Sequence, residues 1–188
     1  MKIQNANQLS GRAVGSIFFA CFGTGWLFLA LAAKQIINPA TVAATMRGMT
    51  GLLIAAAFLL WQAKRWPHVP DDPAIKRAFL WINAIQWIAI AIVAVTLGRL
   101  HLDAYATSAI AGIAGLHLFP LARLFNYPLH NVTGALLVSW AVVSAVFVPA
   151  AEMQGTAAMG TGIILWLSAV VTLAIGLRAA GQPVPVAA

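Results

Sequence analysis

The sequence predicts an all-α protein, a polytopic bundle of six transmembrane helices. Hydrophobic residues make up 62% of the 188 residues and charged residues only 8%, whereas an ordinary soluble domain has about 25% charged residues. Nearly all of the charges fall in short gaps between six long apolar stretches. Because these stretches are continuous and do not alternate between polar and apolar residues, they favour helices over a membrane barrel.

Each stretch has about the 20 residues that a helix needs to cross a hydrocarbon core of about 30 Å. The six predicted spans are, in order, 13–33, 41–62, 75–97, 104–124, 130–148 and 157–177. Together they form a single transmembrane domain over 1–188, with polar or flexible tails at 1–11 and 179–188.

The first three spans are bounded by charges and helix breakers. Arg12 precedes the first span and Lys34 follows it. The second and third spans begin just after Pro39 and Pro73, which suit the first turn of a helix. Gly98 follows the third span. The run Ala30-Leu31-Ala32 leaves a second interpretation of the first span open, as a cleaved signal peptide.

The last three spans are bounded in the same way. The fourth begins after Asp103, and the turn at Tyr127-Pro128 separates it from the fifth. Pro149 ends the fifth span, and Arg178 follows the sixth. With such short connections there is no soluble domain, so any chemistry must lie within the helices or at their mouths.

The positive charges predict the orientation of the bundle. One side collects eight Lys and Arg residues and the other side three; an excess of positive charge marks the cytoplasmic side. Both termini are therefore predicted in the cytoplasm, which agrees with an even number of spans. The charges are scattered among the loops, which favours contact with a lipid bilayer and no binding of nucleic acid. We expect a multi-pass protein of the inner (plasma) membrane.

Polar side chains within the third and fourth spans form a candidate intramembrane site. Asn83 lies six residues beyond Arg77 on the third span, and His117 lies six residues before Arg123 on the antiparallel fourth span. Both therefore lie about 9 Å from the cytoplasmic charges. Gln86 shares a helix face with Asn83. These three side chains are expected to meet.

Pro120 completes this candidate site. It removes an amide donor and frees the carbonyl group of Leu116, so a kink is expected beside His117. Two interpretations of His117 stay open: a neutral packing residue, or a member of a solute path or proton relay. Small residues on the same span permit close approach by another helix. They are Ser108, Ala111, Gly112 and Gly115.

The same stretch carries a family resemblance. Gly115-Leu116-His117-Leu118-Phe119-Pro120-Leu121-Ala122, followed by Tyr127-Pro128, resembles a Gly-x-His-x-x-Pro-Leu-Ala motif of small uncharacterised bacterial inner-membrane proteins with six predicted helices. The resemblance covers about twenty residues and implies a bacterial cytoplasmic membrane protein. It implies no activity.

A second candidate site lies at the inner mouth, around the turn between the fourth and fifth spans. Arg123, Asn126, His130 and Thr133 surround this turn. The exposed amides at the start of the fifth helix add positive potential, so an anion or a lipid headgroup is a fitting ligand. The alternative is a solvated turn that sets topology.

Arg47 is the one charged residue placed well away from the ends of a span. It lies about 12 Å along the second helix from its outer end. It either extends outward to the membrane surface or forms a buried ion pair, for which Asp103 and Glu152 are the candidate partners on the outer side.

Several classes of chemistry find no support in the sequence. No acidic residue lies within a span, so coupling through a midplane carboxylate is not expected. Motifs of zinc proteases, serine hydrolases and phosphate-binding loops are absent. Cys21 is the only cysteine. No catalytic residue, metal site or cofactor is predicted.

Three functions remain as hypotheses. The first is a small-solute transporter, permease or channel-like protein, indicated by the intramembrane polar residues. The second is a non-catalytic structural, accessory or sensory membrane protein, which would form a homo-oligomer or bind a membrane partner through its small-residue faces. The third is an intramembrane enzyme acting on lipid. Enzymatic activity is the least favoured of the three.

Overall fold

The computed structural model describes residues 5–70 and 72–182. Its described residues form six α-helices and one short 3₁₀-helix: α1 (Ala6–Ala33), α2 (Pro39–Ala63), α3 (Pro73–Arg99), η1 (Asp103–Tyr105), α4 (Ala106–Leu124), α5 (Leu129–Phe147) and α6 (Ala150–Ala180). All six α-helices are long and apolar enough to span a membrane. The prediction of an all-α bundle with six spans is confirmed.

The helices extend beyond the apolar stretches at both ends of the chain. α1 begins at Ala6, so residues 6–11, predicted as part of a tail, form its first turns. The side chain of Asn5 caps this helix by accepting a hydrogen bond from the backbone of Gln8. At the other end Ala179 and Ala180 belong to α6, and the rest of the predicted tail beyond Gln182 lies outside the described residues. Hydropathy located the membrane crossing, whereas capping decides where a helix begins.

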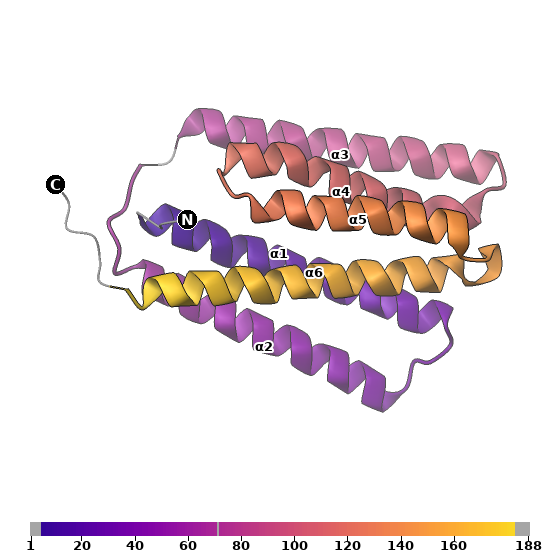
Figure 1. The fold of residues 1–188 in the computed structure, drawn as a ribbon, viewed down its shortest axis with the longest axis horizontal. Coiled ribbons are helices and arrows are strands. Elements are labelled where there is room, and N and C mark those ends of the chain that lie inside the picture. The colour runs from indigo at the N-terminus through magenta and orange to yellow at the C-terminus, as the bar shows by residue number, and fades with distance from the viewer. Residues whose placement is uncertain (1–4, 71, 183–188) are drawn as a thin grey trace.

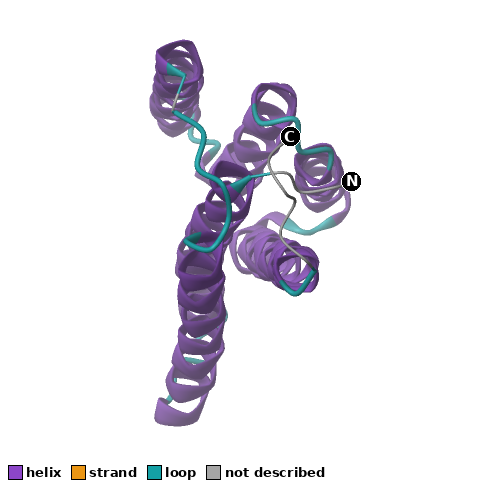
Figure 2. Cartoon of the chain, turned by 90° about the vertical axis from the view of Figure 1, so that its left-hand side faces the viewer, coloured by secondary structure: helices purple, strands orange, loops and turns teal. Residues whose placement is uncertain are grey.

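α1 and α6 pack against each other and form the centre of the bundle (Figure 1). α2 packs against both of them and diverges from them toward Pro39 (Figure 1). α4 and α5 form a second pair that contacts α6. α3 packs against α4 and η1 and is the outermost helix, as the view along the bundle shows (Figure 2). It has no buried residue.

Two glycine contacts bring helix backbones together. A Cβ atom on Gly162 of α6 would lie 2.9 Å from the carbonyl oxygen of Gly23 on α1. A Cβ atom on Gly115 of α4 would lie 2.8 Å from the carbonyl oxygen of Gly134 on α5. No larger residue fits these contacts without a shift of backbone. The predicted close approach at the small-residue face of α4 is thereby confirmed.

Hydroxyl and indole groups connect the same helix pairs. The Ser108 and Ser144 hydroxyls lie 2.9 Å apart between α4 and α5. The indole N–H of Trp166 on α6 donates to the carbonyl oxygen of Ala20 and to the hydroxyl of Thr24 on α1, each at 3.2 Å. Every such bond satisfies a polar group that lipid could not satisfy.

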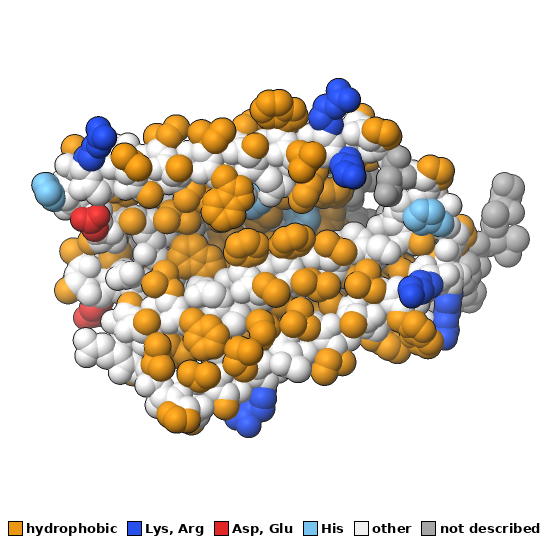
Figure 3. Space-filling model, turned by 180° about the vertical axis from the view of Figure 1, so that it is seen from behind, with side chains coloured by type: hydrophobic (Ala, Val, Ile, Leu, Met, Phe, Trp, Pro, Cys, Tyr) orange, Lys and Arg blue, Asp and Glu red, His pale blue; other side chains and the backbone are white. Residues whose placement is uncertain are grey.

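The outer surface is largely apolar, and most of its charges lie toward the two ends of the bundle, with one Lys or Arg side chain on the lower edge between them (Figure 3). α1 begins and α6 ends at the same end (Figure 1), which we call the inner end. It also contains the α2–α3 loop and the α4–α5 turn. The backbone N–H of Ala6 donates to the carbonyl oxygen of Pro67, so this loop lies against the start of α1. This distribution is that of a multi-pass membrane protein.

Candidate functional site

The structure places a buried polar cluster at the inner end, between α1, α5, α6 and the α4–α5 turn. The turn bends sharply because Asn126 adopts a left-handed conformation with φ of 47°. Asparagine tolerates this region better than most residues. The backbone N–H of Tyr127 then donates to the carbonyl oxygen of Ala122 at 2.9 Å and closes the end of α4. The Tyr127 side chain is buried as a result.

Arg12 is the charged member of this cluster. Its side chain is only 5% exposed, and its guanidinium carbon lies 4.9 Å from the centre of the Tyr127 ring. The Nη1 atom is buried and has no hydrogen-bond partner. Arg12 also forms no ion pair with any acidic residue in the described part of the chain. A cation therefore lies inside the bundle with an aromatic face as its main electrostatic partner.

The energies of these contacts do not balance. Burying a charged group in a protein costs several kcal/mol even after relaxation. A desolvated cation–π contact returns about 2 kcal/mol. The cation–π contact therefore offsets only part of the free energy lost by burying the guanidinium. Proteins accept such a loss of stability mainly at functional sites, which favours a functional role for Arg12.

Tyr127 holds the cluster to α6. Its hydroxyl donates to Thr172 Oγ1 at 3.2 Å. Burial raises the pKa of the Tyr127 phenol above its usual value, although the hydrogen bond with Thr172 and the charge of Arg12 act in the opposite direction. The phenol is therefore neutral at physiological pH. It presents its ring to Arg12 but does not neutralise the guanidinium charge.

His130 supplies a second unpartnered nitrogen atom. Its ring packs edge-on against Tyr127 at 5.0 Å between centres and against Phe19 of α1 at 5.6 Å. Its Nδ1 atom is buried and has no hydrogen-bond partner. Two nitrogen atoms without partners, from α1 and α5, therefore border the same tyrosine.

Two hydroxyl groups meet between α5 and α6. Thr133 lies one turn beyond His130 and is 1% exposed. Its Oγ1 atom lies 2.9 Å from Oγ of Ser168. Each hydroxyl is also within hydrogen-bond distance of a carbonyl oxygen of its own helix. These groups are polar but satisfied, unlike Arg12 and His130.

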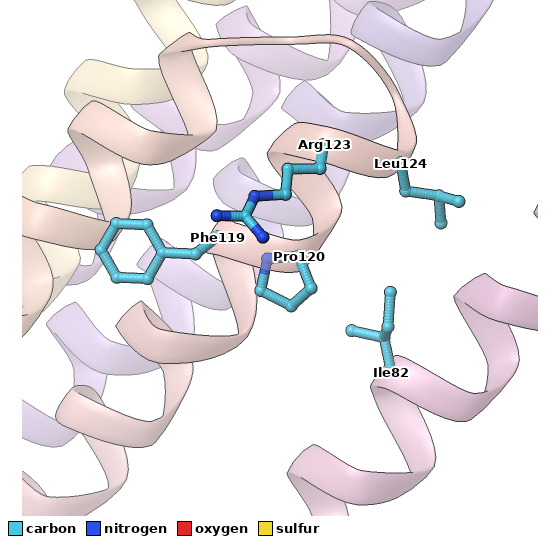
Figure 4. A pocket seen from close by; sticks show the side chains of 5 residues that line it. All are labelled: Ile82, Phe119, Pro120, Arg123 and Leu124. Atoms are coloured by element: carbon cyan, nitrogen blue, oxygen red, sulfur yellow. The ribbon is translucent and has the colours of Figure 1, made fainter.

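The predicted inner-mouth site is divided by the structure. His130 and Thr133 lie in the buried cluster, whereas Arg123 and Asn126 are exposed. Figure 4 shows the Arg123 side chain running back along α4 toward Phe119. The cation of the cluster is Arg12, which the sequence analysis had treated only as a topology signal.

A pattern in α1 identifies the face on which Arg12 lies. Arg12, Ser16, Ala20 and Gly23 follow one another at spacings of three or four residues, so they share one helix face. Small residues on that face mark it as a packing surface. An arginine on a packing surface is a candidate for burial.

The predicted intramembrane site is not assembled by hydrogen bonds between helices. Asn83 donates to the carbonyl oxygen of Phe79 on its own helix at 2.8 Å. His117 Nδ1 donates to the carbonyl oxygen of Ala114, also on its own helix, at 2.6 Å. No hydrogen bond joins Asn83 or Gln86 to His117. All three side chains are half-buried.

A hollow separates α3 from α4 near these residues. It has a volume of about 520 Å³ and is lined by Ile82, Phe119, Pro120, Arg123 and Leu124 (Figure 4). Its lining is apolar except for Arg123. In the view from behind, histidine atoms are visible on the floor of the depression below α3 (Figure 3). The predicted Pro120 thus lines an open apolar hollow.

Arg47 is exposed on α2. It forms no ion pair with Asp103 or Glu152 in the described structure. The divergence of α2 from the bundle leaves this side chain free to extend to the membrane surface. No group of three or more His, Cys, Asp or Glu residues suited to a metal ion occurs in the described ranges.

No protein-family model matches this chain, and comparisons with curated proteins and with solved structures found no match.

Proposed function

We propose that this protein is a small-solute permease of a bacterial inner membrane, with both termini on the cytoplasmic side. One observation carries the proposal: Arg12 is buried among spanning helices and has no acidic partner within residues 5–70 and 72–182. Ionisable groups kept inside a membrane bundle mark paths for solutes or ions. The bacterial membrane follows from the resemblance of the segment around His117, and the orientation follows from the excess of Lys and Arg at the inner end.

Flux through proteoliposomes tests the permease. Entry of small neutral solutes and of sodium salts is followed by stopped-flow light scattering, with empty liposomes as the reference. We expect faster entry of at least one solute with the wild type. Arg12→Gln removes the increase, whereas Arg178→Gln, an exposed arginine near the end of α6, retains it. If no solute enters faster than into empty liposomes, the proposal fails.

The exposure of α3 favours a second candidate, an accessory protein that docks a membrane partner or a second copy. α3 has no buried residue and presents large apolar side chains such as Trp81 and Trp87, at 65% and 57% exposure. Cross-linking of the native membrane from cysteines introduced on this face tests it. Cross-links to one defined protein would favour this function over the permease.

A further inference from the structure

We propose that Arg12 and His130 together bind one small monovalent oxyanion at the inner end of the bundle. The inference rests on the proposed function, because it names the class of solute for the same site. It starts from the two buried nitrogen atoms without partners, Arg12 Nη1 and His130 Nδ1. Both residues border Tyr127: the Arg12 guanidinium carbon lies 4.9 Å from the centre of its ring, and the His130 ring centre lies 5.0 Å from it.

The charge of the site selects an anion. Within the described residues the titratable side chain that contacts both Arg12 and His130 is Tyr127. A histidine carries no negative charge, and the Tyr127 phenol is neutral at physiological pH because burial raises its pKa. Among the residues that the structure describes, no negatively charged group pairs with Arg12. An anion does so, and it gains strength from the low dielectric of the interior.

The single charge of the ligand follows from the single positive charge of Arg12. One buried guanidinium balances one negative charge, and a dianion would leave an excess charge buried. The neighbouring hydroxyls of Thr133 and Ser168 already have partners. The ligand therefore accepts hydrogen bonds from the guanidinium of Arg12 and from the imidazole of His130. His130 donates in the tautomer that carries its proton on Nδ1.

The shape of the donors favours a planar oxyanion. A guanidinium matches carboxylate and nitrate geometry better than it matches a sphere. The rings of Phe19 and Tyr127 both pack edge-on against His130, and such close packing favours a small ligand. A carboxylate such as acetate is the simplest ligand, and the phosphodiester of an anionic lipid headgroup has the same single charge.

Thermal denaturation in a neutral detergent tests this binding. The purified full chain is titrated with sodium acetate, nitrate or sulfate, with ionic strength held constant by the salt of a bulky sulfonate. We expect a saturable rise in Tm with acetate and nitrate, of about 8 °C at a hundredfold excess over Kd. Sulfate is expected to give no saturable rise.

Variants connect the rise to Arg12. Arg12→Gln weakens acetate binding by about 30-fold or more, since it removes the charged partner of a buried anion. Arg12→Lys retains the charge without the planar fork and so binds acetate with intermediate affinity, which keeps the test valid if Arg12→Gln does not fold. Arg178→Gln binds like the wild type. An equal rise in Tm for wild type and Arg12→Gln, or no rise with any anion, overturns the inference.

Two further arms identify the source of the oxyanion and separate the inference from the permease. Nanodiscs of phosphatidylcholine and of phosphatidylglycerol are compared without added acetate. Stabilisation by phosphatidylglycerol that depends on Arg12 supports the oxyanion site and assigns it to a lipid headgroup. Acetate binding without flux retains the inference and overturns the permease. Flux of a neutral solute without anion binding retains the permease and overturns the inference.

Discussion

The inner-end cluster and the α3–α4 hollow both lie near polar residues in the half of the bundle that contains the inner end, but the hydrogen-bonding groups of these residues are satisfied differently in the two regions. Around the hollow, Asn83 and His117 donate to carbonyl groups of their own helices. In the cluster, Arg12 and His130 are packed inside the bundle and each retains a nitrogen atom without a partner. Burial without a partner distinguishes a candidate site from ordinary polarity better than the presence of a polar residue in a span does.

The largest predicted effect concerns the difference in packing between the α1–α6 pair at the centre of the bundle and the peripheral α3. Gly23 of α1 faces α6, where an added Cβ would lie 3.2 Å from the carbonyl oxygen of Gly162. Gly25, two residues further along, has nothing within 4 Å of its added Cβ. Gly23→Val is expected to lower the unfolding free energy by about 3 kcal/mol, and Gly25→Val to change it by less than about 0.5 kcal/mol.

Denaturation in mixed micelles measures both valine variants. In the exposed α3, Ile88→Ala is the corresponding change and should cost little, because Ile88 is 59% exposed. If Ile88→Ala destabilised the protein as much as Gly23→Val, the contrast between a packed centre and a peripheral α3 would be wrong.

A smaller effect is expected at Tyr127. Tyr127→Leu removes the aromatic face from Arg12 and should lower the unfolding free energy by about 2 kcal/mol. Tyr127→Phe keeps that face and loses only the hydrogen bond to Thr172, which contributes about 1 kcal/mol. Equal stability of the two variants in the same denaturation assay would argue against a cation–π contact at this position.

The smallest effect is expected around the hollow. Asn83→Ala removes a hydrogen bond within one helix. Gln86→Ala removes a side chain that forms no hydrogen bond with the described residues. We expect either variant to change the unfolding free energy by less than about 0.5 kcal/mol. In the proteoliposome assay, solute flux should stay within a factor of about two. A tenfold loss of flux would move the solute path from Arg12 to α3 and α4.

The bundle itself could be predicted because it follows from a strong physical rule. Charges are too costly in hydrocarbon to occur at random, so their spacing gives six spans. The close approach around Gly115 could be predicted as well, because small residues four apart share a face. The helix ends could not be predicted from hydropathy. α1 begins earlier than its apolar stretch because the Asn5 side chain caps it by accepting a hydrogen bond from the backbone of Gln8.

The candidate site could be predicted only in part. His130 and Thr133 were found because they lie beside a recognisable turn. Arg123 is a candidate from the sequence because it flanks that turn, whereas nothing in the sequence brings Arg12 to it, since distance along the sequence gives the depth of a residue but not its direction around the helix axis. The same limit applies to Asn83 and His117, which share a depth without sharing a hydrogen bond.

The thermal stability of Arg12→Gln without added anion tests the central claim most directly. If Arg12 is an unbalanced buried cation kept for ligand binding, its removal leaves the ligand-free protein more stable. The Tm should rise by about 3 °C, corresponding to about 1 kcal/mol, while Arg178→Gln leaves it unchanged. A fall in Tm of similar size for Arg12→Gln would show that Arg12 stabilises the bundle and would contradict the account.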